Sequence, residues 1–494
     1  MKLQKLLTDF SKDTPATGRN SEQLFQIYGN DKELFASVQM RIKALLDTFA
    51  ERFAADDVYI VRAPGRVNLI GEHTDYNGYP VMPMALNRDI LVLAMATKEP
   101  IVNISNVDPA YSDREFSLDS GIVPFDGGDW GNYVKAAVNG LLHILREKKK
   151  NINGFRAVFS GNIPGAAGLS SSSAMVVASA LTFLHANRVH LPKIQLAEIL
   201  ARAEHFVGTQ GGGMDQAISL LGQANAALKI DFFPLRVQSK PLSPDYRIVI
   251  CNSFIRAPKT ESAMNEYNRR PIECRIVTGL LAQALGTSYP DRVQRLADLE
   301  KIPGYRERQA KLAEQVLSPP IMSLQQVCEK LDLSEKDFRE KYLKLRSGGY
   351  FTPTADGFKL AQRFKHVIEE AQRVELAASA LENGDMETFG QLMNASHQSC
   401  RDLYEISTPE MDTLTDIARK HGAVGARLTG AGFGGCTVNL VHKNDLDSFI
   451  DKVRKDYYED YLANTHPEIK WQDQPQDTYL FPSQALPGAD VIVS

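Results

Sequence analysis

The sequence predicts an α+β protein of two domains. Its 494 residues are more than one hydrophobic core usually organises, so two domains are the natural expectation. Strand-like and helix-like segments alternate from Val58 onward, and a second strand–helix series begins at Asp245. We therefore expect a first domain over residues 56–235 and a second domain over residues 236–494.

A helical extension over residues 1–55 is expected to precede the first domain. The segment LFASVQMRIKALLDTFAERF, residues 34–53, carries apolar residues at helical spacing. The pattern changes at VYIVRAP, residues 58–64, where β-branched and aromatic residues predict a strand. The extension is therefore treated as separate from the sheet that follows it.

The first domain is expected to combine strands with amphipathic helices. The helix predicted over residues 132–149 ends in cations, which suits a helix C-terminus. Another helix, over residues 170–188, follows a glycine-rich loop. Further strands are predicted at residues 89–97, 100–105 and 155–164.

The second domain is expected to begin with a strand, DYRIVICNS, and to contain a helical insertion at about residues 290–355. That insertion is charged and is interrupted by Pro319-Pro320 and Gly348-Gly349. A long amphipathic helix follows over residues 359–381. Its apolar face is formed by Phe364, Val367, Ile368, Ala371 and Val374.

The composition predicts a folded cytoplasmic protein. Lys plus Arg number 56 and Asp plus Glu number 60, and the resulting net charge of −4 argues against nucleic acid as the main partner. The start, MKLQKLLTDFSKD, becomes charged before a signal-peptide core can form, and no stretch is apolar over the length that a bilayer requires. We expect no membrane association. The odd number of cysteines, with no CxxC pair, predicts a reducing compartment. They are Cys251, Cys274, Cys328, Cys400 and Cys436.

A phosphate-binding loop is one interpretation of GNIPGAAGLSSSSA, residues 161–174. A strand leads into Gly165 and Gly168, and a helix starts in the serine run. A helix N-terminus offers unpaired N–H groups and the positive end of the helix dipole, while serine hydroxyls add donors and a magnesium ligand. The loop is not of the Walker A type, because no Lys follows the glycine. The alternative is a helix N-cap in a turn of small residues.

A polar segment over residues 62–79 suggests a site for a polyol. A polyol binder needs side chains that donate and accept hydrogen bonds, because each sugar hydroxyl does both. The alternative is a solvated polar loop. The polar side chains that crowd beside its glycines are Arg66, Glu72, His73, Asp75 and Asn77.

Asp215 is a candidate proton acceptor. It follows three consecutive glycines and precedes a predicted helix, AISLL, in the segment over residues 203–217. A carboxylate there could accept a proton from a substrate hydroxyl. The alternative is that Asp215 caps the helix, and Glu204 of the same segment would otherwise pass as a helix-surface acid.

A fourth glycine segment, residues 430–435, matches the pattern G-x-G-x-x-G. A dinucleotide-binding fingerprint requires a strand before the loop and a helix after it. Here the loop leads into CTVNLV, which is expected to form a strand. The sequence therefore argues against a Rossmann-type site.

Together these segments resemble galactokinases, within the family of galacto-, homoserine, mevalonate and phosphomevalonate kinases. GRVNLIGEHTDYN resembles the galactokinase signature, GLSSSSA the phosphate loop and GGGMDQ the catalytic-aspartate segment. GARLTGAGFGGC resembles the C-terminal glycine loop, and MNASHQSCRDLYEIS, residues 393–407, is a further similar stretch. The matches occur in the family's order from about residue 58 to about residue 455.

The resemblance implies a two-domain sugar kinase. Its first domain would hold a mixed sheet with a left-handed βαβ unit, and its second domain would be ferredoxin-like. The implied reaction converts α-D-galactose to α-D-galactose 1-phosphate in galactose catabolism, the Leloir pathway. ATP would be the cosubstrate and Mg²⁺ the cofactor.

The resemblance also implies roles for individual residues. Asp215 matches the catalytic aspartate and Arg66 the arginine beside it, which could stabilise charge on the transferring phosphoryl group. Sugar-binding residues would be Arg66, Glu72, His73, Asp75, Gly213, Asp215 and Tyr267. Nucleotide-binding residues would be Trp130, Gly165, Gly168, Leu169, Ser170, Ser171 and Ser172, with core packing as the alternative for Trp130. Ser172 and Glu204 would bind magnesium, although the run of four serines leaves the register open by one residue.

Two other functions stay open at this point. GTQGGGMDQAIS and SHQSCRDLYEIS resemble N-acetylgalactosamine kinases, whereas Thr74 and Asn77 resemble galactose-specific members. An N-acetylgalactosamine 1-kinase is therefore the first alternative. A weakly catalytic sensor of galactose and ATP is the second, against which the intact serine run and Asp215 argue. The oligomeric state is left open, with a monomer favoured.

Overall fold

The computed structural model describes most of the chain, and the described chain divides into two compact units. One unit comprises residues 1–67, 83–228 and 483–494, and the other comprises residues 68–82 and 229–482. The predicted boundaries at residues 55 and 235 stay predictions. The described residues are 2–10, 19–29, 31–53, 57–148, 151–165, 167–208, 212–256, 261–345 and 348–493.

The first unit contains a mixed sheet of six strands. The strands predicted near residues 58, 89, 100 and 155 are all present, and two short strands, β4 and β12, complete the edges. The order across the sheet is β12-β1-β2-β5-β3-β4. The bounds are β1 Tyr59–Ile70, β2 Met82–Thr97, β3 Ile101–Asn106, β4 Arg114–Ser117, β5 Gly154–Gly161 and β12 Asp490–Val493.

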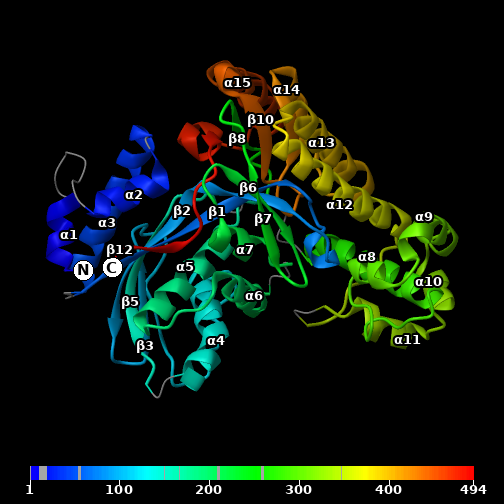
Figure 1. The fold of residues 1–494 in the computed structure, drawn as a ribbon, viewed down its shortest axis with the longest axis horizontal. Helices are drawn as coiled ribbons and strands as arrows, with labels where there is room; N and C mark the ends of the chain where they lie inside the picture. The colour runs from blue at the N-terminus through cyan, green and yellow to red at the C-terminus, as the bar shows by residue number, and fades with distance from the viewer. Residues whose placement is uncertain are drawn as a thin grey trace. The chain divides into compact units, whose positions relative to one another are not determined.

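Helices cover both faces of this sheet (Figure 1). Leu91 and Leu93 of β2 pack with the N-terminal helices α1 Leu3–Phe10, α2 Arg19–Tyr28 and α3 Lys32–Arg52. Side chains alternate along a strand, so the fully buried Val92 lies on the opposite face. The other group of helices in this unit comprises α4 Gly131–Lys148, α5 Ser171–Ala186, α6 Lys193–Ala203 and α7 Met214–Leu221.

The expected β–α–β unit is represented by β3 and β5. These strands are parallel neighbours, and α4 lies between them in the chain. A parallel pair needs such a long connection, because the chain must run back to the end of the sheet at which the first strand started. The left-handed sense of this connection stays a prediction.

The second unit contains a ferredoxin-like sheet of four strands. Their order is β11-β8-β10-β9, which is 4-1-3-2 in chain order, with β10 antiparallel to both neighbours. This is the strand order of a β-α-β-β-α-β unit. The strands are β8 Tyr246–Asn252, β9 Ala423–Leu428, β10 Cys436–His442 and β11 Leu480–Ser483, and a separate pair is β6 Ala226–Asp231 with β7 Arg236–Pro241.

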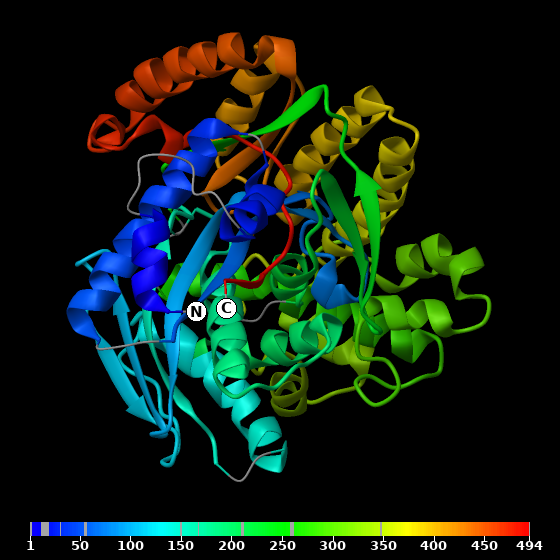
Figure 2. The ribbon, with the colours of Figure 1, turned by 60° about the vertical axis from the view of Figure 1, so that its left-hand side comes forward.

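A long helical stretch fills the first connection of this unit, between β8 and β9. Helices α12 and α13 run side by side (Figure 2). The helices of the unit are α8 Glu261–Ala284, α9 Tyr305–Val316, α10 Leu324–Leu331, α11 Glu335–Phe338, α12 Leu360–Glu382, α13 Met386–Ser399, α14 Pro409–Lys420, α15 Leu446–Val453 and α16 Ala463–Thr465.

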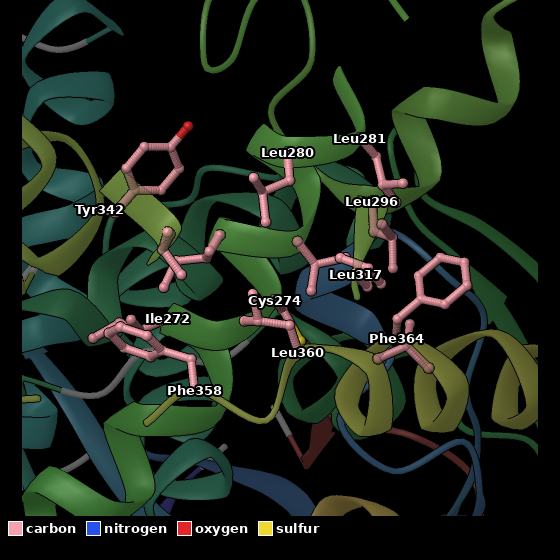
Figure 3. Close-up of a cluster of buried hydrophobic side chains, with 14 of the residues drawn as sticks. Ile272, Cys274, Leu280, Leu281, Leu296, Leu317, Tyr342, Phe358, Leu360 and Phe364 are labelled. Carbon is pink, nitrogen blue, oxygen red and sulfur yellow. The ribbon is translucent and has the colours of Figure 1, made fainter. Parts of the chain in front are cut away.

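Residues 290–355 share a hydrophobic core with α8 and α12. Figure 3 shows Leu296, Leu317 and Tyr342 of this region in one cluster with Leu280 of α8 and Phe364 of α12. The region is thus packed onto α8 and α12 rather than extended into solvent. Among the described helices, none has the length and apolar character needed to cross a membrane.

The N-terminal helices are joined to the sheet by a buried carboxylate, Asp89 of β2. Its oxygens accept hydrogen bonds from Tyr28 Oη at 2.7 Å, Arg41 Nη1 at 2.8 Å and Arg62 Nε at 2.7 Å. Burial alone would raise the pKa of Asp89, but the two guanidinium groups and the tyrosine hydroxyl lower it. Asp89 therefore stays ionised and connects α2 and α3 to β1 and β2.

We predict that Asp89→Asn lowers the free energy of unfolding by about 3–5 kcal/mol at neutral pH, because two buried guanidinium groups lose their charged partner. Since the folded pKa of Asp89 is depressed, its contribution is complete above its ordinary pKa of 3.8 and is lost as pH falls below that value. Urea denaturation of both proteins from pH 7 to pH 3 measures this difference.

The matched control is Asp113→Asn, which removes the exposed partner of Arg52 on the same helix, α3. An exposed pair contributes less than about 1 kcal/mol. An equal loss in the two variants, or a loss at Asp89 that does not shrink in acid, would contradict the prediction.

Candidate active site

Arg66 and Asp215 form an ion pair within the first unit. Arg66 lies on β1 and Asp215 lies in the first turn of α7. Arg66 donates from Nε to Oδ1 at 2.9 Å and from Nη2 to Oδ2 at 3.0 Å, a bidentate geometry. The arginine side chain is 7% exposed and the aspartate side chain 26%. The guanidinium is therefore held inside the protein, whereas part of the carboxylate faces solvent.

The predicted phosphate loop contacts the same pair. Arg66 Nη1 donates to the carbonyl oxygen of Gly168, and the Ser170 hydroxyl donates to Asp215 Oδ2. The structure thus brings together both residues that were predicted to be catalytic and two that were predicted to bind nucleotide. Ala166, Thr209, Gln210 and Gly211, which belong to the quoted motifs, lie outside the described residues.

Gly65 allows the phosphate loop to lie directly on β1. The backbone N–H of Arg66 donates to the carbonyl oxygen of Leu169 at 3.1 Å. A Cβ atom on Gly65 would lie 2.7 Å from that oxygen, so a larger residue would displace the loop. Helix α5 begins at Ser171, immediately after the loop. The first backbone N–H groups of the helix therefore point toward the loop, as a phosphate site requires.

Glu204 is a buried acid with an unpartnered oxygen. The residue is 5% exposed, and its Oε1 atom has no hydrogen-bond partner. Burial raises the pKa of Glu204 to about 7, Ser173 opposes this rise by hydrogen bonding, and Asp215 adds to it. An oxygen of this kind fits a cation, which would relieve the cost of the buried charge. The serine whose hydrogen bond acts on Glu204 is Ser173, and the predicted role of Ser172 stays a prediction.

Trp130 packs into the first unit. It is 7% exposed, its Nε1 atom donates to the carbonyl oxygen of Ser112 at 2.9 Å, and its ring meets Phe159 edge-on at 5.6 Å. These contacts account for its burial, and its predicted place in an adenine pocket stays a prediction.

In the second unit, Glu72 is held by an arginine that the sequence did not single out. Residues 71–79, here called the signature loop, follow β1, and Glu72 is 2% exposed. Arg427 donates from Nη2 to Glu72 Oε2 at 2.8 Å and from Nη1 to the carbonyl oxygen of Asn68 at 2.9 Å. Arg427 lies in the segment GARLTGAGFGGC. The sequence does not set it apart from the other residues of that segment, whereas its contact with Glu72 does.

His73 of the signature loop uses both ring nitrogens within the protein. Nε2 lies 3.1 Å from the carbonyl oxygen of Ala431, and Nδ1 lies 3.0 Å from Tyr76 Oη. A carbonyl only accepts, so Nε2 carries the proton and Nδ1 accepts from the tyrosine. Burial lowers the pKa of His73 to about 3, so the ring is neutral. For His73 to bond to a sugar hydroxyl, one of these two hydrogen bonds would therefore have to break.

The remaining predicted sugar residues are divided between the two units. Tyr267 lies near His73, with ring centroids 6.4 Å apart, and the buried Asp75 begins a short 3-10 helix over Asp75–Asn77. Gly213 precedes α7 with a φ of 105°. Tyr404, which the sequence did not indicate, bonds to Tyr76 Oη at 2.7 Å through its own hydroxyl.

Comparison with known proteins defines the class of protein. The GHMP kinases N terminal domain matches residues 132–223, and the GHMP kinases C terminal domain matches residues 377–459. The galactokinase galactose-binding signature matches residues 47–96. Mevalonate kinase of Methanococcus jannaschii has a TM-score of 0.52 at 17% identity, over 87% of this chain and 99% of its own, which shows the shared fold. The protein is thus a two-domain kinase of the GHMP fold, and this confirms the predicted fold class.

More similar relatives narrow the class. The galactokinase of Dictyostelium discoideum is 35% identical, over 97% of this chain and 99% of its own, and that of Saccharomyces cerevisiae is 30% identical, over 92% and 96%. The structure of Lactococcus lactis galactokinase complexed with galactose has a TM-score of 0.66 at 28% identity, over 90% of this chain and 98% of its own. The chain belongs to the galactokinase family.

Proposed function

We propose that the protein transfers the γ-phosphoryl group of ATP to the anomeric hydroxyl of α-D-galactose, which yields α-D-galactose 1-phosphate and ADP. The observation that carries this proposal is the Arg66–Asp215 pair in hydrogen-bond contact with a phosphate-type loop, in a member of the galactokinase family. The relatives do not favour the N-acetylgalactosamine alternative.

Asp215 is proposed to receive the sugar hydroxyl at Oδ1. A carboxylate has about four lone-pair positions. Arg66 uses one position on Oδ1, and Arg66 and Ser170 together use two on Oδ2. Counting the bonds from the described residues, the remaining position lies on Oδ1, on a side chain that is partly exposed. A hydroxyl that donates there is both oriented and made more nucleophilic.

In the transfer, the anomeric oxygen bonds to the γ-phosphorus, and the bond from that phosphorus to the β,γ-bridging oxygen breaks. ADP leaves with the electron pair of the broken bond, and the hydroxyl proton passes to Asp215. Phosphoryl transfer depends chiefly on positioning and electrostatics, so Arg66 is proposed to stabilise the charge of the transferring group.

Glu204 and a serine in the first turn of α5 are proposed to hold Mg²⁺. Among the described residues, no group of three or more His, Cys, Asp or Glu could hold a metal. Mg²⁺ fits this arrangement, because it commonly takes one or two carboxylates and completes its shell with phosphate oxygens and water. When bound, the ion would neutralise charge on the phosphates. Ser172 is the predicted ligand and Ser173 is the serine whose hydrogen bond acts on Glu204.

The other assignments are also proposals. ATP would bind along Gly165, Gly168, Leu169 and the serines that follow, with Trp130 near the adenine. The signature loop, Tyr267 and Gly213 keep their predicted roles as sugar-binding residues. The cytoplasmic location, the monomeric state and the predicted domain boundaries are retained as proposals.

The function is tested with a panel of sugars in a coupled ADP assay. We expect kcat/KM to be highest for galactose, lower for N-acetylgalactosamine and lowest for glucose. An inverted C4 hydroxyl leaves a buried polar group of the site unpaired, which costs about 1–3 kcal/mol. If kcat/KM is highest for N-acetylgalactosamine, the protein is an N-acetylgalactosamine 1-kinase. If ADP is released at the same rate without any sugar, the proposal is wrong.

Asp215→Asn is expected to lower kcat by about 10²–10⁴-fold, because asparagine keeps the shape of the side chain but cannot accept the proton. Binding of galactose and ATP should persist, which calorimetry can measure on the same preparation. Near-normal turnover in a preparation free of wild-type enzyme would show that Asp215 is not the proton acceptor.

Glu204→Gln and Ser172→Ala are expected to shift the magnesium titration of activity to higher concentrations, with the KM for galactose little changed. Each substitution removes a proposed oxygen ligand from an ion that keeps few protein ligands. Ser173→Ala is the comparison that resolves the register, because the hydrogen bond of Ser173 lowers the pKa of Glu204. Unshifted titrations for all three variants would leave the acid and the serines with structural roles only.

A further inference from the structure

Helix α12 presents one face to the signature loop. His366, Glu370 and Val374 are spaced four residues apart, so they lie on the same side of the helix. Gly71, the first residue of the loop, has a φ of 96°, and a Cβ atom there would lie 2.9 Å from Val374 Cγ2. The loop therefore begins in direct contact with α12.

Glu370 binds the backbone of the loop with a fully buried carboxylate. Its Oε1 atom accepts from the N–H of Gly71 at 2.8 Å and from the N–H of Glu72 at 3.3 Å. The Ser396 hydroxyl donates to the same oxygen at 2.5 Å, and Arg373 Nε donates to Oε2 at 2.7 Å. Burial would raise the pKa of Glu370, but Arg373 and the other positive and donor groups lower it to about 2. Glu370 is thus a permanent acceptor for the two loop N–H groups.

His366, on the same face of α12, binds the backbone of Glu72 through its carbonyl oxygen. Its Nε2 atom lies 3.1 Å from the carbonyl oxygen of Glu72, and its Nδ1 atom lies 2.9 Å from Ser399 Oγ. Burial lowers the pKa of His366 to about 4, so the ring is neutral, and Nε2 must donate because a carbonyl only accepts. The N–H of Glu72 is held by Glu370, its C=O by His366 and its carboxylate by Arg427.

We propose that Glu370, assisted by His366, is a positioning residue that fixes the backbone of Glu72 and so sets the geometry of the signature loop for the sugar before it binds. The proposal rests on the proposed function, since the loop is assigned there to galactose. A loop that is already ordered loses little conformational freedom on binding, which increases affinity without any new contact to the ligand. Neither residue needs to touch the sugar.

The test substitutes Glu370→Gln and compares it with Glu369→Gln. Glu369 is the adjacent acid on α12, is 39% exposed on its side chain, and has only longer ion pairs, at 3.8 Å to Lys365 and 3.7 Å to Arg373. Glu370→Gln replaces one carboxylate oxygen with an NH₂ group, which cannot accept a hydrogen bond. The hydrogen bonds from the N–H groups of Gly71 and Glu72 therefore weaken. We expect the KM for galactose to rise about tenfold, with the KM for ATP within about twofold of wild type and kcat within about threefold.

A purely structural role would give a different result. Partial unfolding lowers the amount of active enzyme and therefore the apparent kcat, and it leaves both KM values unchanged. An unchanged KM for galactose in Glu370→Gln, an equal rise in both KM values, or the same effect in Glu369→Gln would overturn the proposal.

Two further measurements cover the case in which Glu370→Gln does not fold. His366→Phe keeps the aromatic ring that stacks on Tyr404 at 4.2 Å but removes the N–H donor, so the KM for galactose should again rise alone. Hydrogen exchange in this variant should speed up at the amide of Glu72, while the amide of Asn68, which donates to Thr429, stays protected. Unchanged exchange at Glu72 would overturn the proposal. If the wild-type enzyme does not phosphorylate galactose, the proposed function fails, and the exchange result still decides whether α12 orders the loop.

Discussion

The bidentate pair between Arg66 and Asp215 is the interaction on which the candidate active site depends. It joins the strand that carries the signature motif to the helix that carries the predicted catalytic carboxylate. Through Gly168 and Ser170 the same two side chains also hold the phosphate loop. Three segments that are remote in sequence thereby share one hydrogen-bonded geometry. A change in any of them is expected to disturb the others, because they are joined by direct hydrogen bonds.

The same device, a carboxylate that binds groups from several segments, recurs away from the reacting centre. Asp89 of β2 accepts hydrogen bonds from α2, α3 and β1. Glu370 of α12 accepts hydrogen bonds from the start of the signature loop and from α13. In each case several donors surround one fully buried acid. Removal of a partner would leave a charge without compensation in a medium of low polarity, which is costly. These acids therefore specify where each segment lies more strongly than apolar packing alone would.

Much of this arrangement could be predicted from the sequence, and the part that could not has a physical reason. The elements β1, α4, α5 and α12 were predicted because their strand or helix pattern is strong, whereas the long helix α8 was not predicted. The resemblance brought Asp215, Arg66 and the serine run into one site. Glu370 and His366 were not predicted, because polar residues spaced four apart on a helix normally indicate a solvated face. Their burial depends on a loop some 300 residues earlier in the chain. The short strands β4 and β12 were missed because four residues carry too little periodicity.

The acids discussed above differ in how exposed their side chains are, and the difference follows their proposed roles. Asp89 and Glu370 are fully buried and lie among donors, and both pKa values are depressed, so neither can exchange a proton near neutral pH. Asp215 keeps 26% of its side chain exposed, which suits its proposed role as the group that receives the substrate hydroxyl. Glu204 is buried, with 5% exposure, but unlike Asp89 and Glu370 it has one oxygen, Oε1, without a hydrogen-bond donor. Burial raises its pKa to about 7. The proposed Mg²⁺ would supply the partner that Oε1 of Glu204 lacks.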